Sequence, residues 1–251
     1  MPSSPTTWLR SSGNRMLDLL YPPCCSACGT DMEPPVDQPV FCDACLEAMP
    51  TFSWPVCPRC AARVPEFFDT DSDCGNCRPV KLWFDRTMAV GEYEGRLRDL
   101  LLRMKQEKSQ VLAATFARLL ADRLGESLMA LKPDVIVPIP MHSWRRLVRR
   151  TNPAEAVAEA LGRRLGLPTA RALLKQRRNM RPQLGLTRPG RIRNVHGQFV
   201  VAAGYSLESA HVLLVDDIMT TGATCSEAAR VLKHKGAGQV TALVVGRTSS
   251  S

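Results

Sequence analysis

Two spacings of apolar residues organise the chain after residue 80. Short, mostly apolar runs are typical of strands buried on both faces, as in a parallel sheet. Such runs predict strands at Val135–Pro140, Gln198–Val201, Val212–Val215 and Val240–Val245. Residues 84–93 alternate in polarity and predict a pair of strands with a turn near Gly91.

The longer segments between these runs repeat apolar residues every three or four positions, as amphipathic helices do. They predict helices at Leu97–Lys105, Val111–Leu124, Ala154–Leu165 and Cys225–His234. Gly125 and Gly166 are expected to end two of them. Pro153 suits a first helical position, where the missing N–H costs nothing. Strands alternating with helices indicate a parallel α/β sheet with right-handed crossovers.

The first third of the chain shows neither spacing and holds nine of the ten cysteines. Eight form four C-x-x-C pairs, with 13 residues between the first and second pairs and 13 between the third and fourth. Two such pairs complete a tetrahedral site without an open position, so two structural Zn²⁺ ions are predicted. Consecutive pairs are expected to share an ion, and a crossed pairing is the alternative. The predicted ligands are Cys25, Cys28, Cys42, Cys45, Cys57, Cys60, Cys74 and Cys77.

A disulfide framework is the competing interpretation of these cysteines. The N-terminus lacks the charged segment, apolar segment and cleavage site of a secretion signal, so a cytoplasmic protein with reduced thiols is expected. Zinc is therefore favoured. Cys24 is either a free neighbour of the first pair or a replacement for Cys25. Cys225 is expected to be a packing residue, although a helix start can lower a thiol pKa.

The composition is that of a globular protein of 251 residues, 45% hydrophobic and 23% charged. No apolar run reaches the roughly 20 residues of a membrane-spanning helix, so no membrane insertion is expected. The net charge of +9 is uneven. Residues 1–80 carry −5 (five basic, ten acidic), and residues 81–251 carry +14 (28 basic, 14 acidic). The second part is therefore expected to bind anions, either phosphorylated small molecules or nucleic acid.

The most specific chemistry follows the run Val212–Val215. Asp216 and Asp217 come next, and a loop of hydroxyl residues around Gly222 then leads into a predicted helix. Amides and the dipole at a helix start favour an anion, so this layout predicts a phosphate site. The two carboxylates suit ribose hydroxyls or a hydrated Mg²⁺, which prefers oxygen ligands. An ordinary Asp-rich turn is the alternative, and the loop and helix fit it poorly.

This stretch, VLLVDDIMTTGAT, resembles the phosphoribosyl-pyrophosphate (PRPP) motif of type I phosphoribosyltransferases. The resemblance implies that the aspartates hold the ribose hydroxyls and the loop holds the 5′-phosphate, with Mg²⁺ carried mainly on ligand oxygens. Catalysis would consist of positioning and of charge stabilisation on the departing pyrophosphate, without a side-chain nucleophile. The implied PRPP-binding residues are Asp216, Asp217, Thr220, Thr221, Gly222, Ala223 and Thr224.

Residues 16–248 as a whole are similar to the ComF/GntX family. Besides the PRPP motif, the resemblance rests on LLYPPCCSACG (19–29), YEGRLRDLLLRMK (93–105), VIVPIPMH (135–142) and PQLGLTRPGRIRNVHGQF (182–199). It implies a parallel-sheet, type I phosphoribosyltransferase-like α/β domain preceded by a small cysteine-rich module. The implied divisions are an N-terminal segment at 1–23, a double zinc ribbon at 24–80 and the phosphoribosyltransferase-like domain at 81–251.

The basic segment after VIVPIPMH departs from the family pattern, which usually ends in R-G-F-N-Q. Residues 149–153 read RRTNP, so Arg150, Thr151 and Pro153 replace the glycine, the aromatic residue and the glutamine. The positive charge is kept, and an anion can still dock there. Candidates for contacts with pyrophosphate or other anions are Lys105, Arg145, Arg146, Arg149, Arg150 and Arg191.

The resemblance implies two possible functions. ComF-like proteins are associated with uptake of DNA and growth on it, which suggests a PRPP-binding protein that handles single-stranded DNA. Candidate nucleic-acid contacts are Trp144, Arg177, Arg178 and Arg181. The alternative is an active, amidophosphoribosyltransferase-like enzyme that transfers ribose 5-phosphate to an unidentified base or amine in nucleotide metabolism. The acidic ribbons could also dock a partner such as a DNA-translocating helicase.

Overall fold

A computed structural model describes residues 22–33, 40–70, 72–107, 109–141, 151–177 and 195–248. The chain forms two compact units, Met1–Ala48 and Met49–Ser251, and each is described by itself. The first four predicted zinc ligands fall in the smaller unit. The other four fall in the larger unit, together with the predicted α/β domain. The division of the sequence at residue 80 stays a prediction.

The smaller unit contains one short helix, α2 (Asp43–Glu47), within its described residues. A tight turn precedes it, in which the N–H of Gly29 donates to the carbonyl of Cys25 over 2.9 Å. Cys24 pairs with Asp31 in an antiparallel bridge. Helix α2 starts directly after Cys42 and carries Cys45 on its buried side. The turn and the helix therefore each carry one C-x-x-C pair.

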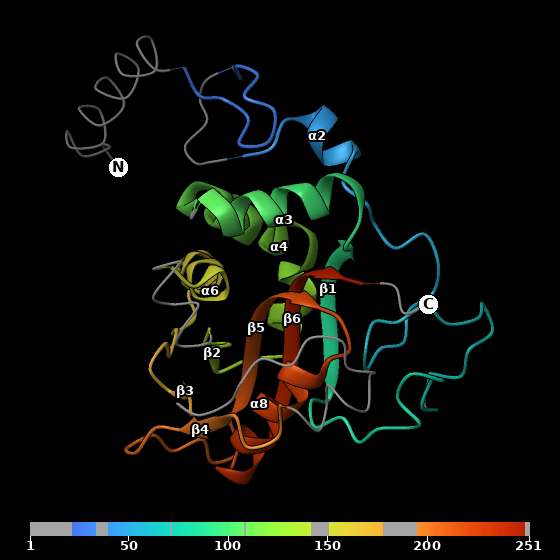
Figure 1. Ribbon diagram of the computed structural model, residues 1–251, viewed down its shortest axis with the longest axis vertical. Coiled ribbons are helices and arrows are strands. Elements are labelled where there is room, and N and C mark those ends of the chain that lie inside the picture. Colours follow the sequence, from blue (N-terminus) through green and yellow to red (C-terminus); the bar gives the residue numbers. More distant parts are fainter. Residues whose placement is uncertain are drawn as a thin grey trace, which may run out of the picture. The chain divides into compact units, whose positions relative to one another are not determined.

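A four-stranded parallel sheet forms the centre of the larger unit (Figure 1). Its strands are β1 (Arg86–Glu92), β6 (Gln239–Arg247), β5 (His211–Met219) and β2 (Val135–Pro138), in that order across the sheet. Val215 pairs with Leu243 on one side and Pro138 on the other. A parallel bridge between Ile136 and Thr169 extends the β2 edge. The predicted parallel α/β sheet is confirmed.

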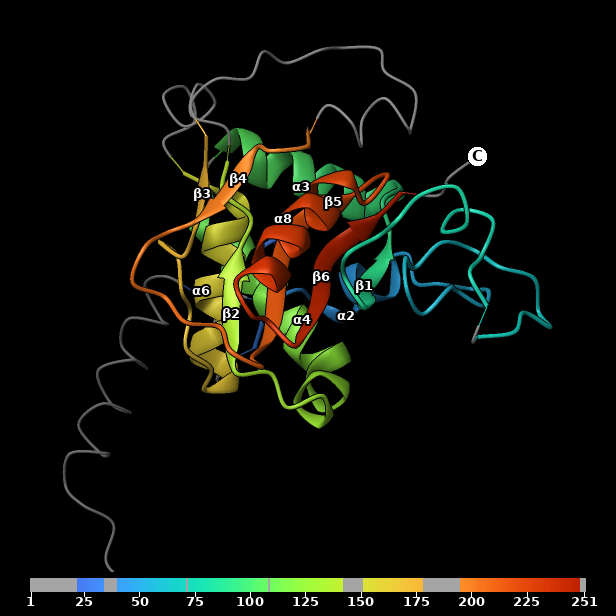
Figure 2. The same ribbon diagram turned by 90° about the horizontal axis from the view of Figure 1, so that it is seen from below.

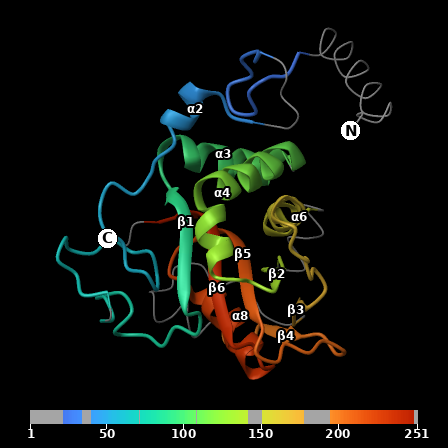
Figure 3. The ribbon, with the colours of Figure 1, turned by 180° about the vertical axis from the view of Figure 1, so that it is seen from behind.

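Helices cover both faces of this sheet. Helices α4 (Gln110–Ala130) and α6 (Pro153–Leu165) pack against each other on one face, and α8 (Ala223–His234) covers the opposite face (Figures 1 and 3). Helix α3 (Gly95–Glu107) lies near the carboxyl ends of the strands. Pro153 begins α6, and Gly166 ends it with a left-handed φ of 68°, both as predicted.

A separate pair of antiparallel strands, β3 (Leu174–Gln176) and β4 (Phe199–Val201), lies on the β2 side of the sheet (Figure 2). The sequence predicts β4 but not β3. Strand β3 has three residues and only Leu174 is buried, so it carries no readable alternation of polarity. The pair stands at the two ends of the segment 178–194, which lies outside the described residues.

The predicted strand pair with a turn at Gly91 is wrong. Strand β1 runs straight through Gly91, which pairs with Gly246 of β6 in parallel register. A Cβ added at Gly91 would lie 1.9 Å from the carbonyl oxygen of Pro50. The glycine is therefore needed for close approach of another backbone segment, a requirement that gives the same sequence signal as a turn.

Two further boundaries differ from the prediction. Helix α4 continues past Gly125 to Ala130, and Gly125 is a buried residue of this helix, where an added Cβ would lie at an ordinary contact distance of 3.7 Å from Leu165 of α6. Strand β5 continues beyond Val215 to Met219, so Asp216 and Asp217 lie within the strand. The ladder to β6 holds this polar end in extended form, through pairs such as Ile218 with Gly246.

The core of the larger unit spans the sheet, α8 and the second cysteine cluster. Val212, Leu214 and Val244 are fully buried in it, and Cys57 and Cys77 belong to the same apolar cluster. The second ribbon therefore shares its hydrophobic core with the α/β domain.

No helix in the described part of the chain is long and apolar enough to cross a membrane.

Candidate functional site

The predicted phosphate loop connects the carboxyl end of β5 to the start of α8. Thr220 is exposed at its beginning, and Gly222 has a left-handed φ of 77° directly before the helix. A Cβ at Gly222 would lie 3.3 Å from Cζ of the buried Phe84. Glycine therefore meets both a backbone and a packing requirement at this turn.

The first turn of α8 presents amides to this loop. The N–H of Ala223 donates to Oγ1 of Thr221 over 3.3 Å, and the first helical bond runs from Ser226 N–H to the Gly222 carbonyl. The first amides of a helix have no partner within it, and the helix dipole adds positive potential. This end of α8 therefore has the geometry of an anion site.

The two aspartates point in different directions, because successive strand residues face opposite sides of a sheet. Asp216 faces α8: its Oδ1 accepts the N–H of Asp217 at 2.9 Å, and its Oδ2 lies 4.0 Å from Sγ of Cys225. Asp217 faces α3, where its Oδ2 lies 3.0 Å from Nζ of Lys105. These two side chains are only 15% and 20% exposed. An ion pair thus lies beside the predicted phosphate loop.

Burial and the charge of Asp217 raise the pKa of the Asp216 carboxyl to about 8, and the nearby Lys105 opposes them. The thiol of Cys225 is buried, and this burial, together with the two aspartates, raises its pKa well above the ordinary value. A helix start can lower a thiol pKa, but at Cys225 burial and the two aspartates outweigh that effect. Its role as a packing residue agrees with its exposure of 1%.

Of the other predicted anion and nucleic-acid contacts, only Lys105 and Arg177 lie in the part of the chain that the structure describes. Arg177 is exposed, and its N–H donates to the carbonyl of Gln198 next to the β3–β4 pair. The remaining candidates fall outside the described residues: Trp144, Arg145, Arg146, Arg149, Arg150, Arg178, Arg181 and Arg191.

Two tetracysteine clusters match the predicted consecutive pairing. Within each, the four sulfur atoms all lie within 4.8 Å of one another; the sets are Cys25, Cys28, Cys42, Cys45 and Cys57, Cys60, Cys74, Cys77. Zinc–sulfur bonds of about 2.3 Å in a tetrahedron place sulfurs about 3.8 Å apart. The sulfurs of Cys28 and Cys42 are 3.8 Å apart, and those of Cys57 and Cys77 are 3.9 Å apart. Both clusters fit structural zinc.

Crowding of the thiols spreads their pKa values in each cluster. Hydrogen bonding with Thr30 lowers the pKa of Cys28 to about 6, while burial raises that of Cys45 to about 12. In the second cluster, hydrogen bonds from Cys60 and Cys77 lower the pKa of Cys57, and hydrogen bonding to Cys57 raises that of Cys60 to about 12. A divalent cation stabilises all four thiolates together.

The structure also reveals site residues that the sequence analysis missed. Arg247, at the end of β6, is 1% exposed and donates hydrogen bonds to the carbonyls of Met219 and Thr220 at the start of the loop. Phe84 packs under Gly222. Ser226 accepts the N–H of Trp83 at 3.1 Å. For Arg247 the sequence did offer a signal: it is a charged residue at the end of the apolar run that forms the last strand.

The parallel α/β sheet, the loop between β5 and α8 and the two tetracysteine clusters define a protein with a phosphoribosyltransferase fold and two zinc-ribbon sites. Residues 16–78 match the double zinc ribbon domain, and residues 107–250 match the phosphoribosyl transferase domain. The chain belongs to the ComF family, in which these two domains are joined.

Curated relatives resemble this chain over most of their length. Competence protein F of Haemophilus influenzae is 29% identical over 80% of this chain and 87% of its own. DNA utilization protein YhgH of Salmonella typhi is 28% identical over 84% of this chain and 98% of its own. Competence protein ComFC of Streptococcus pneumoniae is 26% identical over 81% of this chain and 86% of its own.

Proposed function

We propose that the protein binds PRPP together with Mg²⁺ at the loop between β5 and α8. One observation carries the proposal: the start of α8, which has the geometry of an anion site, follows by a short loop the strand β5 that carries Asp216 and Asp217 near its carboxyl end. The start of α8 supplies amides for the 5′-phosphate, with the hydroxyls of Thr220, Thr221 and Thr224 as further donors. The phosphoribosyl transferase domain match supports the same ligand class.

Asp216, Asp217 and Lys105 supply the contacts to the parts of PRPP other than its 5′-phosphate. Asp217 accepts hydrogen bonds from ribose hydroxyls, and Lys105, now paired with Asp217 at 3.0 Å, contacts the pyrophosphate. Asp216 supports Asp217 from the other side through the bond to its N–H. Mg²⁺ is bound mainly by ligand oxygens and retains several waters, as is usual for this ion. This division of roles gives both Asp216 and Asp217 a partner in the complex.

Calorimetric titration with PRPP and Mg²⁺ tests this proposal. Asp217→Asn is expected to weaken PRPP binding at least about tenfold, because a hydrogen bond to a charged group contributes about 1.5–3 kcal/mol. Asp99→Asn is the matched control, since Asp99 is an exposed acid on α3 with its own ion pair. Equal affinities of the wild type and Asp217→Asn, or no heat of binding in the wild type, would contradict the proposed site.

We infer a role in DNA uptake or utilisation, as the names of the relatives suggest. The positive charge of residues 81–251 supports contact with single-stranded DNA. The proposed contacts are Trp144, Arg177, Arg178 and Arg181. Binding through phosphates releases counterions, so affinity for a single strand is expected to fall by about 300-fold between 50 and 200 mM salt if six phosphates are contacted. Fluorescence anisotropy with a labelled oligonucleotide measures this slope, and an unchanged affinity would refute phosphate contact.

Turnover of PRPP is the second candidate function, supported by a cavity next to the carboxyl end of β2. This cavity of about 550 Å³ is lined by Pro138, Met141, Asn152, Arg171 and Gln176, among other residues. Cavities of this volume hold drug-sized or smaller ligands, so a planar base or an amine fits. Pyrophosphate release from PRPP in the presence of single bases or amines tests it. Release that is independent of every acceptor would refute a transferase.

We also propose that the acidic ribbons dock a protein partner, such as a DNA-translocating helicase. The support is charge: residues 1–80 carry −5, which disfavours direct contact with DNA. Co-purification of the full-length protein with a candidate helicase, compared with a variant in which ribbon acids are replaced by amides, tests this role. Equal capture of the helicase by both proteins would show that the acidic residues of the ribbons do not form the docking surface.

A further inference from the structure

Arg247 connects the second tetracysteine cluster to the phosphate loop. Its Nε donates to the carbonyl of Cys60 at 2.8 Å. The same guanidinium donates to the carbonyl of Met219 at 3.3 Å and to that of Thr220. Arg247 is 1% exposed, so a single buried cation bonds both to a residue of the cysteine cluster and to the first residues of the loop.

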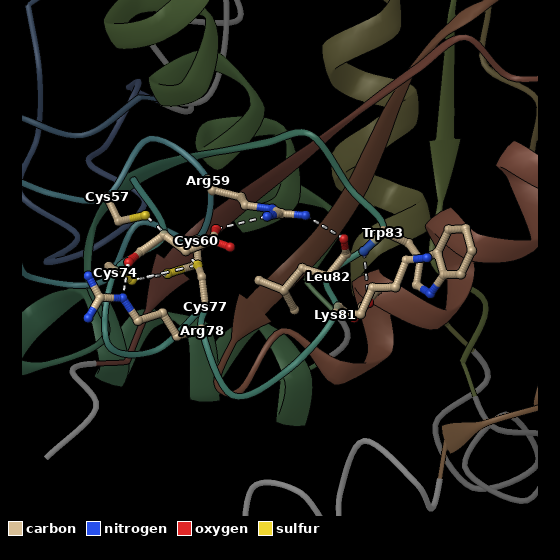
Figure 4. Close-up of polar contacts among 11 residues, drawn as sticks. Cys57, Arg59, Cys60, Cys74, Cys77, Arg78, Lys81, Leu82 and Trp83 are labelled. Atoms are coloured by element: carbon tan, nitrogen blue, oxygen red, sulfur yellow. Dashed lines mark hydrogen bonds and ion pairs between the residues drawn. The ribbon is translucent and has the colours of Figure 1, made fainter. Parts of the chain in front are cut away.

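A second connection starts from the same cysteine turn. Arg59 lies between Cys57 and Cys60, and its guanidinium donates to the carbonyl of Leu82 at 2.7 Å (Figure 4). The next residue, Trp83, donates its N–H to Ser226 in the first turn of α8. Residues 82–84 therefore connect the cysteine turn, through Leu82, with the start of α8, through Trp83. Phe84 packs against Gly222 of the loop.

The peptide geometry gives the Arg247 bonds a consequence for ligand binding. The C=O and N–H of a trans peptide point in opposite directions. When Arg247 holds the carbonyls of Met219 and Thr220, the N–H groups of Thr220 and Thr221 must point away from the guanidinium. The buried arginine therefore sets the direction of the amides at the beginning of the loop.

The position of the Cys60 carbonyl depends in turn on the cluster. Residues 57–77 contribute no helix or strand in their described part. Their backbone bonds close the tight turn, as from Ala61 N–H to the Cys57 carbonyl, form one isolated bridge between Val56 and Arg63, and join Pro58 to Thr87 of β1. Short segments of this kind take most of their folding free energy from the metal. The edge strand β1 holds the other side of the turn, where Thr87 Oγ1 donates to the Arg59 carbonyl at 2.7 Å.

We propose that Arg247 is a positioning residue through which zinc at the second cluster orders the phosphate loop, so that zinc and the anionic ligand bind cooperatively. The ligand in this inference is the PRPP of the proposed function, on which it rests. Coupling between two binding sites is reciprocal: zinc raises the affinity for PRPP, and PRPP raises the retention of zinc by the same factor. The first cluster lies in the Met1–Ala48 unit, and its zinc serves as the internal control.

Hydrogen exchange of the full-length protein tests the inference without any ligand. Cys74→Ser, which takes one of the four ligands from the second cluster and so weakens its zinc binding, is expected to raise amide exchange in residues 219–223 at least about tenfold. Cys42→Ser at the first cluster is expected to leave these amides unchanged. Protection in α6 reports that the sheet remains folded in both variants. Unchanged loop exchange in Cys74→Ser would overturn the inference.

Two further variants keep zinc and break only the connection. Arg247→Lys retains the charge but loses the planar fork that reaches several carbonyls. Arg59→Met breaks the second connection at a side chain that is 36% exposed, so this protein is expected to fold. Both are expected to raise loop exchange at least threefold while metal analysis still finds two zinc ions. If loop exchange in both variants equals that of the wild type, the two arginines do not connect the second cluster to the loop.

Zinc occupancy at equilibrium with a chromophoric chelator tests reciprocity. Saturating PRPP with Mg²⁺ is expected to raise the zinc affinity of the second cluster at least fivefold in the wild type, the lower end of usual coupling. In Arg247→Lys this increase is expected to disappear, and the zinc affinity of the first cluster does not change in either protein. Calorimetry separates the failures: no PRPP binding refutes the proposed function, whereas PRPP binding with unchanged zinc affinity refutes the coupling.

Discussion

The carboxyl group of Asp216 lies between a second acid and a buried thiol, and this position controls how its charge responds to pH. Its pKa of about 8 means that the folded protein keeps a proton there which the unfolded chain, with an ordinary value of 3.8, has lost. Stability is therefore expected to fall as pH rises from about 4 to about 8, since the unfolded state binds fewer protons in that range.

Replacing Asp216 by asparagine is expected to remove this dependence. At pH 8 the variant should melt at a higher temperature than the wild type by about 2–4 °C for each kcal/mol recovered, and at pH 4 the difference should vanish. Calorimetric melting at the two pH values measures it. Asp99→Asn, an exposed acid on the neighbouring helix, is the control and should follow the wild type. A shift that is equal at both pH values would show that Asp216 does not titrate near 8.

At the scale of elements, the turn between β5 and α8 combines a left-handed backbone with a close packing contact. Gly222→Ala is expected to cost about 1–2 kcal/mol for the backbone alone. It costs more if Phe84, 3.3 Å from the new Cβ, cannot move. Gly204→Ala is the matched control, because Gly204 has a φ of 86° and nothing within 4 Å of an added Cβ. Urea unfolding of both variants separates the two costs, and equal losses would mean that Phe84 yields without strain.

Elements whose signal is local could be predicted from the sequence, and those set by distant neighbours could not. The apolar runs at Val212 and Val240 gave buried strands, because burial on both faces leaves no polar position. The cysteine spacing gave both clusters. Gly91 misled the prediction because it makes room for the backbone of Pro50, far away in the sequence. Gly125 misled it because the helix continues through a buried glycine instead of ending there. Arg247 was missed for the same reason: its partners Cys60 and Thr220 are brought to it only by the fold.

At the scale of the whole molecule, the two ribbons differ in the interactions that stabilise their folded structure. The first tetracysteine cluster belongs to the Met1–Ala48 unit, whose described residues form one five-residue helix and an isolated bridge. The second shares its core with the sheet, where Cys57 and Cys77 are 1% exposed beside Met219 and Phe84. Loss of metal is therefore expected to have different consequences at the two sites.

Removal of zinc by a chelator is expected to unfold the ribbons before the α/β domain, and the first ribbon before the second. The metal supplies most of the folding free energy of such small segments, whereas burial in the sheet core retains the second ribbon longer. Limited proteolysis during chelation should cut first within residues 25–48, then within 57–77, while circular dichroism of the helices persists. Excess zinc added with the chelator is the control. Simultaneous cleavage of both ribbons and the sheet would contradict this order. It would show that the fold of the α/β domain itself depends on zinc at the second cluster.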